Sequence, residues 1–256
     1  MRQDLYDELF ELEERHWWHV VKRKWCRTLA EKFSEGQNLK MLDIGCGTGQ
    51  NMKELGSMGK VWGVDISNKA IEYCIRRGLK RVIRGRMEKL PFRNSSFDVV
   101  VALDVLEHGD DSRALKEVKR VLRPGGMVVI SVPAYQWLWS KWDEVLGHKR
   151  RYRRSKLVEA VGKHGFNVLR ATYYNLWSLP FAVVIRNIKT MWFKERGYES
   201  DFRFGGKWIN RLALGCGYLE CYLANMLNIT WPMGLGIFVV ARKSILLRQK
   251  STSGLV

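Results

Sequence analysis

The sequence lacks several patterns that would place it in a common functional class. Its five cysteines include no Cys-x-x-Cys pair and no zinc-type spacing, which argues against a zinc finger. Their odd number and lack of a framework suit a reducing cytoplasmic interior. Residues 1–20 have no charged head followed by an apolar run, so no secretory signal is expected. No clean run of about twenty apolar residues is present, which argues against a transmembrane helix.

Acidic residues are scarce relative to basic ones. The chain of 256 residues has 44 Lys and Arg against 26 Asp and Glu, a net charge of +18. Such a surplus predicts attraction to polyanions, either nucleic acid or an anionic membrane face, unless it reflects a generally basic proteome or solubility. The 46% hydrophobic content argues against disorder, and the length suits one large domain with an embellishment.

An apolar strand that runs directly into glycines is the most informative feature. The stretch Met41–Gly49 ends with a glycine at every second position, and a second strand ends in Asp65. Glycines let backbone approach a ligand closely, and a carboxylate at the next strand's tip is placed to accept hydrogen bonds from a ribose. A dinucleotide fingerprint needs a glycine where Gln50 stands, and no P-loop Gly-Lys-Ser/Thr follows. An adenosyl group that carries an amino acid therefore fits better; a tight turn in a non-binding α/β protein is the alternative.

With four further motifs, this loop and strand resemble the ordered motifs of class I S-adenosylmethionine-dependent methyltransferases. The resemblance covers roughly residues 38–133. Further stretches, at His16-Trp17-Trp18 and from Pro133 to Tyr152, resemble a subgroup of small-molecule methyltransferases. The motifs are Leu42–Gly49, Gly63–Ser67, Leu90–Phe92, Ser96–Val100, Leu103–His108 and Val121–Gly126.

The resemblance implies a binding site for S-adenosylmethionine. Asp43 and the glycine loop would hold the methionine part, Asp65 the ribose, and the region of Met87 the adenine. The chain departs from the family at Arg86, where an acidic residue often meets the exocyclic amine. Adenine recognition then rests on backbone groups, or the motif is displaced by one residue. The implied cofactor residues are Asp43, Gly45, Cys46, Gly47, Gly49, Asp65, Ile66, Met87, Glu88 and Leu103.

Alternating strands and helices between 39 and 133 predict an α/β fold with a parallel sheet covered on both faces. We expect a Rossmann-like, seven-stranded, mostly parallel sheet with an N-terminal helical lid and a helical insertion between strands six and seven. The expected parts are the lid 1–35, the cofactor-binding core 36–174 and 233–243, the insertion 175–232 and a tail 244–256. Strands are expected near 40–44, 61–65, 81–84, 97–103, 127–132, 166–174 and 235–242, and helices near 48–56, 68–77, 111–121 and 153–165.

The insertion stands where this fold normally has a short hairpin. Its segments 176–193 and 208–229 are apolar but interrupted by charged residues, and the first also by Pro180. Aromatic side chains beside Arg and Lys suit helices that lie in a membrane interface; a buried helical lid and a dimer contact are the alternatives. The basic charge favours an anionic bilayer, where each nearby Lys or Arg contributes about 1 kcal/mol.

Ligands of open α/β sheets bind outside the carboxyl ends of the strands, so the acceptor site is expected in the segments after strands four and five and in the N-terminal helices. His148 is the candidate base for an acceptor proton. Asp143 would orient it or act itself, and transfer without a protein base is the alternative; no metal is expected. The densest positive run would meet a phosphate or pyrophosphate head group, or form a solvated helix face; it consists of Arg150, Arg151, Arg153 and Arg154. Predicted acceptor-site residues are Trp17, Trp18, His108, Tyr135, Arg150, Arg151 and Tyr152.

The sequence therefore predicts a methyltransferase that acts on a small, amphiphilic or lipid-linked acceptor at a membrane surface. An RNA or DNA methyltransferase is one alternative, although no Asp/Asn-Pro-Pro-Tyr element follows strand four. A non-catalytic S-adenosylmethionine-binding protein is another, and the intact glycine loop and Asp65 argue against it. The expected location is the cytoplasm, either free or peripheral on the inner face of the membrane. The acceptor, the methylated atom and the oligomeric state stay open.

Overall fold

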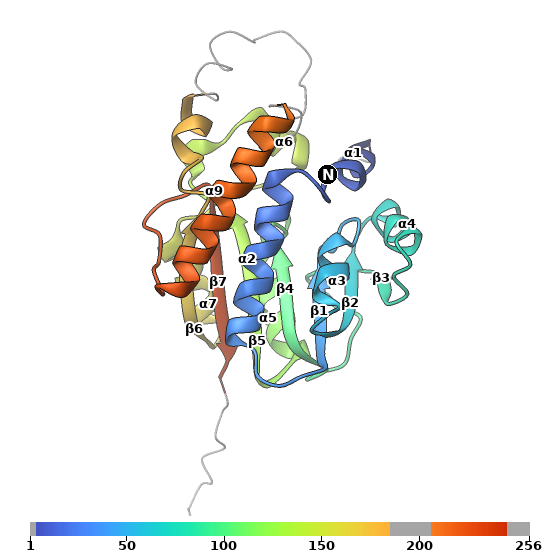
Figure 1. The fold of residues 1–256 in the computed structure, drawn as a ribbon. Coiled ribbons are helices and arrows are strands. Elements are labelled where there is room, and N and C mark those ends of the chain that lie inside the picture. Colours follow the sequence, from blue (N-terminus) through green and yellow to red (C-terminus); the bar gives the residue numbers. More distant parts are fainter. Residues whose placement is uncertain (1–3, 185–205, 245–256) are drawn as a thin grey trace, which may run out of the picture.

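The computed structural model describes residues 4–184 and 206–244, and a seven-stranded sheet forms its centre (Figure 1). The strand order is β3-β2-β1-β4-β5-β7-β6. The first five strands pair in parallel, and β7 runs antiparallel to both β5 and β6. The predicted mostly parallel sheet is confirmed. The strands are β1 (Leu39–Ile44), β2 (Gly59–Asp65), β3 (Val82–Arg84), β4 (Phe97–Leu103), β5 (Leu122–Pro133), β6 (Phe166–Tyr174) and β7 (Gly236–Lys243).

Strand β5 differs most from the expected boundaries. It begins at Leu122, which pairs with Phe97, whereas the sequence places its start near residue 127. The register shifts between Phe97 and Val99, and the Pro-Gly-Gly turn lies within this irregularity. Because a bulge absorbs extra residues without ending the pairing, the strand continues through a turn signal.

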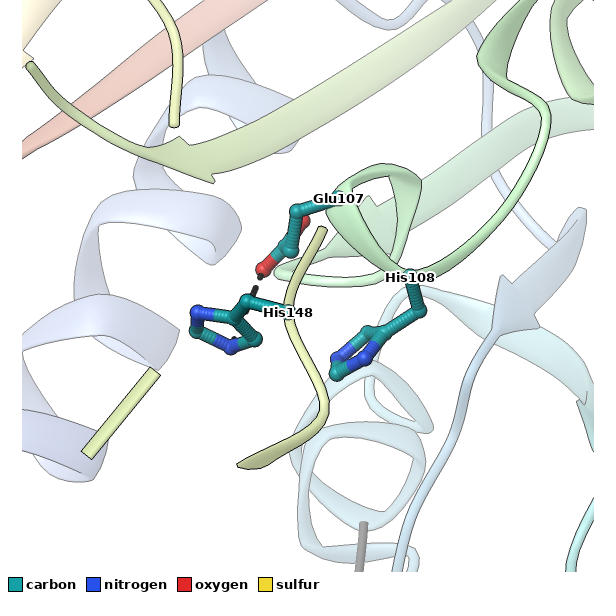
Figure 2. Close-up of side chains that lie close together, drawn as sticks. All are labelled: Glu107, His108 and His148. Atoms are coloured by element: carbon teal, nitrogen blue, oxygen red, sulfur yellow. Dashed lines mark ion pairs between the residues drawn. The ribbon is translucent and has the colours of Figure 1, made fainter. Parts of the chain in front are cut away.

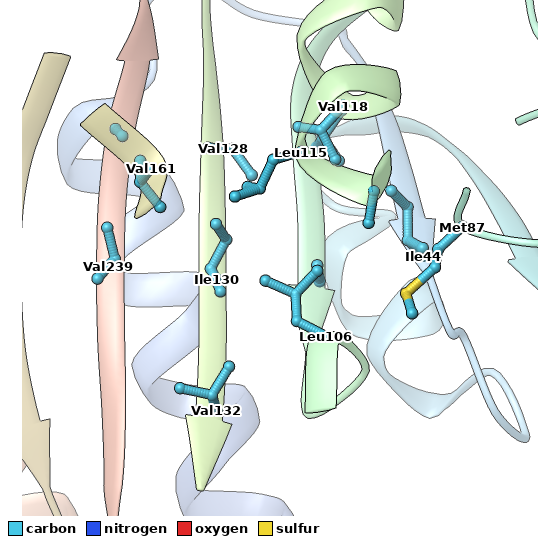
Figure 3. Close-up of a cluster of buried hydrophobic side chains, with 14 of the residues drawn as sticks. Ile44, Met87, Leu106, Leu115, Val118, Val128, Ile130, Val132, Val161 and Val239 are labelled. Atoms are coloured by element: carbon cyan, nitrogen blue, oxygen red, sulfur yellow. The ribbon is translucent and has the colours of Figure 1, made fainter. Parts of the chain in front are cut away.

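Helices cover both faces of the sheet (Figure 1). Side chains of α2, α3 and α9 join one buried apolar cluster, and those of α5 and α7 join another on the opposite face. Figure 3 shows the second cluster, where Leu115 of α5 and Val161 of α7 pack toward Ile130 and Val239 of the sheet. The helices are α1 (Asp4–Leu12), α2 (Trp17–Phe33), α3 (Gln50–Leu55), α4 (Asn68–Arg76), α5 (Asp111–Val121), α6 (Lys141–Leu146), α7 (Arg154–Lys163) and α9 (Lys207–Met226), with short 3-10 turns η1 (Leu106–His108) and η2 (Gln136–Leu138).

The central strands are apolar along their whole length because helices cover both of their faces. Every residue of β7 from Gly236 to Ala241 is buried. Each fully buried Val, Leu or Ile contributes about 1.5–3 kcal/mol relative to an exposed one, so this core holds the strands in one register. The carboxyl ends of β1, β2 and β4 consequently lie at one edge of the sheet, and the predicted functional loops follow them.

Helix α9 forms part of the predicted insertion between β6 and β7. It packs lengthwise against α2 (Figure 1). A Cβ on Gly217 would lie 2.4 Å from Cγ2 of Val21, so the two helices approach closely only because this residue is glycine. Within the described residues, no helix combines the length and apolar character needed to cross a bilayer. The predicted apolar segment 176–193 continues past residue 184, and that part lies outside the described residues.

Candidate cofactor and active site

The glycine loop after β1 has a backbone that other residues rarely adopt. Gly45, Gly47 and Gly49 have φ angles of 69°, 54° and 90°. A Cβ would lie 2.7 Å from Cγ2 of Val105 at Gly45, and 2.5 Å from Cδ1 of Leu79 at Gly49. At Gly47 the nearest atom is 3.7 Å away, on helix α1. A side chain therefore has no room at Gly45 or Gly49, and at Gly47 the loop exposes its backbone without a Cβ.

Asp65 ends β2 beside this loop. Its carboxylate accepts the backbone N–H of Gly47 at 3.0 Å and of Ser67 at 2.9 Å. The hydroxyl of Tyr6, from helix α1, donates to it at 3.5 Å. Burial raises the pKa of Asp65 and outweighs these hydrogen bonds. The Asp65 carboxylate is thus a buried hydrogen-bond acceptor at the position predicted for a ribose. The hydroxyl of Tyr6 already approaches it there.

Asp43, near the end of β1, is buried and only partly hydrogen-bonded. Its Oδ2 accepts Nδ2 of Asn51 at 3.1 Å, and its Oδ1 has no hydrogen-bond partner among the described residues. Burial raises the pKa of Asp43 to about 7, and the charges of Asp65 and Glu13 add to the increase. An ammonium group would supply the missing donor and the compensating charge. The residues at the ends of β1 and β2, called the cofactor crevice below, therefore fit the methionine end of S-adenosylmethionine.

The other cofactor residues expected from the sequence lie around the same edge. Cys46 is buried with its sulfur 4.0 Å from that of Cys74, as expected for a thiol that fills space. Met87 is nearly buried, and Ile66 is 53% exposed beside Asp65. Glu88 accepts the N–H of Asp110 at 3.3 Å. Leu103, partly buried, ends β4. Their contact with the cofactor stays a prediction.

Helix α1 lies against the glycine loop through residues that sequence reasoning missed. Glu13, just after the helix, accepts the hydroxyl of Thr48 and pairs with Arg77 at 2.7 Å. Tyr6 reaches Asp65, as above. The partners are 35 to 64 positions apart in the chain, so no local pattern announces these contacts. The amphipathic character of residues 1–12 was the available signal.

A buried ion-pair network follows β5. Asp143 accepts two hydrogen bonds from the Arg151 guanidinium, at 2.7 and 3.0 Å, and one from Nδ1 of His148 at 2.9 Å. Burial alone would raise the pKa of Asp143, but these bonds and the Arg151 charge hold it well below its usual range. Because both carboxylate oxygens are engaged and the side chain is buried, Asp143 is suited to orienting His148. These bonds disfavour Asp143 as the base, and its role stays a prediction.

His148 faces Glu107 and lies beside His108 (Figure 2). Its Nε2 is 3.8 Å from Oε1 of Glu107, and the centres of the two imidazole rings are 4.9 Å apart. Nδ1 of His108 lies 3.1 Å from the carbonyl oxygen of Gly147. Burial and the nearby Asp104 charge raise the pKa of Glu107 well above its usual range. Sequence reasoning did not assign Glu107; its position directly after β4, at the ligand-binding edge, was the signal.

A second buried pair borders this cluster. Lys22 of α2 forms an ion pair with Asp104, which also accepts the hydroxyl of Ser131. Burial would raise the pKa of Asp104, but the Lys22 charge lowers it below its usual value. The pair connects an N-terminal helix to the end of β4 and was not expected from the sequence.

Two predicted acceptor-site residues make hydrogen bonds within the protein. Arg151 is committed to Asp143 and to the carbonyl of Ala134. The hydroxyl of Tyr152 donates to Asp111 at 2.9 Å from a buried position. These contacts leave less of either side chain for an acceptor, and contact of Arg151 and Tyr152 with a substrate stays a prediction. Arg150 pairs with Asp111 at 3.1 Å but stays partly exposed.

The aromatic residues expected at the acceptor site lie near the start of the insertion. The ring of Trp17 is 5.5 Å from that of Trp18 and 5.2 Å from that of Trp177. Tyr135 stacks on Tyr173 with ring centres 5.1 Å apart. All three of the predicted rings are partly exposed, so their contact with an acceptor stays a prediction.

Comparison with known proteins adds three findings. The family described as "Methyltransferase domain" matches residues 42–130. The uncharacterized protein MJ1252 of Methanocaldococcus jannaschii is 33% identical over 208 residues, which cover 78% of this chain and 74% of that protein. The demethylmenaquinone methyltransferase of Staphylococcus aureus is 34% identical over 114 residues, 41% of this chain and 47% of the enzyme. The chain thus spans about half the length of that enzyme.

A solved structure shares the fold of this chain over nearly the whole length of both chains. It is the methyltransferase in a complex between the Haloferax volcanii Trm112 methyltransferase activator and the putative methyltransferase, with a TM-score of 0.62 and 18% identity. The alignment covers 94% of this chain and 97% of the other. At 18% identity this likeness shows the fold alone. With the match to the methyltransferase domain family and the similarity to named methyltransferases, the chain belongs to the class I S-adenosylmethionine-dependent methyltransferases.

Proposed function

We propose that this protein transfers a methyl group to a small, amphiphilic or lipid-linked acceptor at an anionic membrane surface. The reaction class and the cofactor are those of the family. The observation that carries the membrane surface is an apolar stripe on the outside of helix α9. The name of the Staphylococcus aureus relative, a demethylmenaquinone methyltransferase, adds an example of an apolar acceptor.

The apolar stripe consists of large side chains on one side of α9. They recur at spacings of three, four or seven residues and so share one face of the helix. Each is between 55% and 76% exposed. A soluble surface helix normally turns such a face toward the core, and an exposed apolar patch marks an interaction site. The stripe residues are Trp208, Leu212, Leu219, Tyr222 and Met226.

The opposite face of α9 fixes this orientation. Glu220 accepts the backbone N–H groups of Asn175 and Leu176 at 2.6 and 2.9 Å. The guanidinium of Arg170 on β6 donates to the carbonyl oxygen of Ala224 at 2.7 Å. These buried contacts hold the opposite face of α9 against the core. The side chains of the stripe therefore point away from the core. The expected alternative of a buried lid is therefore disfavoured for this helix.

An anionic bilayer is the occupant that best matches the surroundings of the stripe. The guanidinium of Arg211 lies 5.6 Å from the ring of Trp208, and Lys207 precedes it at the start of the helix. Basic side chains beside tryptophan are typical of helices that lie in a membrane interface. The net charge of +18 adds a long-range attraction to anionic headgroups.

Vesicle flotation tests the membrane surface. The protein is expected to float with vesicles that contain phosphatidylserine, and less so as salt is raised. Leu212→Glu combined with Leu219→Glu is expected to weaken binding at least about tenfold, because each leucine removed from the interface costs about 1.5–3 kcal/mol. Ile75→Glu on α4, where Ile75 is 59% exposed, is the matched control. Unchanged flotation of the double variant would contradict the proposal, and binding to RNA in its place would favour the nucleic-acid alternative.

The crevice residues would position the cofactor in a fixed orientation. When bound, S-adenosylmethionine supplies a methyl group on a sulfonium sulfur. Asp43 would hold the ammonium group and Asp65 the ribose, while α1 would exclude water from the glycine loop. Alignment of this kind supplies up to about 7–11 kcal/mol of a barrier without any proton transfer.

His148 is the residue best placed to activate the acceptor. Since Asp143 holds its Nδ1, its Nε2 lone pair is free either to take a proton from the acceptor or to bind a Lewis acid. His148→Ala is therefore expected to lower kcat by about two orders of magnitude or more while changing cofactor affinity little. His164→Asn, which alters the histidine that directly follows α7, is the control. Methyl transfer at an unchanged rate in His148→Ala would remove this role.

A further inference from the structure

Three side chains of metal-ligand type converge after β4 and α6 (Figure 2). Glu107 and His108 come from η1, and His148 follows α6. One ligand atom of each lies within 4.8 Å of those of the other two. The residues come from segments about forty positions apart, so the tertiary fold brings them together.

Glu107 is the first sign that a cation belongs here. Its side chain is 0% exposed, and neither carboxylate oxygen has a hydrogen-bond partner among the described residues. A buried carboxyl group without donors is costly, and proteins normally pair such groups with donors, charges or metal ions. Its Oε1 faces Nε2 of His148 at 3.8 Å, too far for a hydrogen bond and near the separation of two ligands of one ion.

The two histidines are held as metal-binding histidines are. Nδ1 of His108 meets the carbonyl oxygen of Gly147, which only accepts, so this nitrogen carries the proton. Nδ1 of His148 meets the carboxylate of Asp143, which Arg151 keeps in place. In both rings Nε2 therefore carries the lone pair that a metal ion would take. A carboxylate or carbonyl bound to the far nitrogen is the arrangement that orients metal-ligating histidines.

We propose that Glu107, His108 and His148 bind a divalent transition-metal ion of the zinc class. Two imidazole nitrogens and one carboxylate match catalytic zinc sites, which keep a further position open. Magnesium and calcium prefer oxygen ligands and suit this set less well. With metal–ligand distances of about 2.0–2.2 Å, tetrahedral ligands lie about 3.4 Å apart, so the cluster needs to contract by little more than 1 Å. The proposed site differs from the metal-free expectation of the sequence analysis.

The metal site adjoins the cofactor crevice. Val105, two residues before Glu107, is the neighbour that would contact a Cβ on Gly45 of the glycine loop. Gly109, one residue after His108, likewise abuts Met87 and Glu88. An acceptor oxygen bound at the open position of the ion would thus lie at the edge of the cofactor site. This role, unlike metal binding itself, rests on the proposed function.

The ion would act as a Lewis acid on an acceptor hydroxyl. Coordination lowers the pKa of the hydroxyl, which releases its proton to solvent. The resulting oxygen attacks the methyl carbon, a C–O bond forms, and the electron pair of the breaking C–S bond stays on sulfur as a neutral thioether. His148 then acts as a ligand, and transfer to oxygen is favoured over transfer to carbon.

Metal titration of the full chain tests the site. After treatment with a chelator, calorimetry is expected to show one Zn²⁺ per protein, with Mg²⁺ binding far more weakly. Glu107→Gln and His108→Asn are each expected to weaken Zn²⁺ binding by about 100-fold or more, since even residues that only support ligands contribute about 10–100-fold. Glu159→Gln, on the exposed face of α7, removes a carboxylate elsewhere and should leave the affinity unchanged.

Thermal unfolding shows whether a variant that binds Zn²⁺ weakly is still folded. Saturating Zn²⁺ should raise the melting temperature of the wild type and of Glu159→Gln, and not that of Glu107→Gln. Equal Zn²⁺ affinity in the wild type and Glu107→Gln, or no stoichiometric binding at all, would overturn the proposal. Both measurements are made without the methyl donor. Absent metal binding with intact S-adenosylmethionine binding therefore counts against this site alone, whereas absent S-adenosylmethionine binding counts against the proposed function.

Discussion

Replacing Asp65 by alanine is expected to lower S-adenosylmethionine affinity at least about tenfold, and by about 100-fold where both ribose hydroxyls lose an acceptor. Hydrogen bonds to a charged group contribute about 1.5–3 kcal/mol each. The carboxylate also accepts Gly47 N–H at 3.0 Å, so its loss would loosen the glycine loop. Calorimetry with S-adenosylmethionine and with its demethylated product measures the effect. Equal affinity in Asp65→Ala would remove the ribose assignment.

Tyr6→Phe is the matched control for this prediction. It removes the hydroxyl that approaches the Asp65 carboxylate at 3.5 Å and leaves the carboxylate in place. If Asp65 binds a ribose, the cofactor hydroxyls take over from Tyr6, and the affinity of Tyr6→Phe should equal or exceed that of the wild type. A similar loss of affinity in both variants would instead point to damage to the contact between α1 and the glycine loop. Thermal melting of each variant shows whether the fold is retained.

Asp43 is expected to make cofactor affinity depend on pH below neutrality. Burial raises its pKa to about 7, and only its ionised form pairs with an ammonium group. As pH falls below 7, protonation of Asp43 should weaken S-adenosylmethionine binding by about tenfold per pH unit. Asp43→Asn should weaken binding by about two to four orders of magnitude at pH 7 and above, because an unpaired buried charge costs about 3–5 kcal/mol.

Nearby acids need to be separated from this effect. The pKa of Asp65 and that of Glu13 are also raised by burial, so either could add to the pH dependence. Asp43→Asn keeps both of these acids. The part of the pH dependence of cofactor affinity that is lost in this variant therefore belongs to Asp43. Asp98→Asn, near the amino end of β4 and away from the crevice, should retain the full slope. An unchanged slope in Asp43→Asn would contradict the ammonium assignment.

Local sequence patterns predicted most elements of the core. Helix α5 begins and ends where the sequence analysis expects, at residues 111 and 121, and Asp110 caps it by accepting Arg113 N–H at 3.0 Å. Strand β5 was misjudged because a Pro-Gly-Gly turn normally ends a strand, whereas here pairing of Leu122 with Phe97 continues it. Capping is a local property, and strand pairing depends on a partner distant in the chain.

The candidate site likewise combines residues that local patterns predict with residues whose partners are distant in the chain. The cofactor crevice was predictable because its glycines and Asp65 follow two neighbouring strands at fixed positions. The ion pair of Arg151 was not predicted because its partner, Asp143, is reached only when the loop after β5 folds back. Glu107 was passed over because its sequence context does not reveal that it is buried without a donor.

The sequence by itself determined the sheet, the glycine loop and the cofactor class, because each depends on residue types at short, fixed spacings. Only the tertiary structure decided what the remaining side chains face. It joined Glu107 and His108 to His148, held α1 over the glycine loop, and turned the apolar stripe of α9 outward. These arrangements depend on packing between segments far apart in the chain, and neither residue spacing nor composition encodes which of their faces meet.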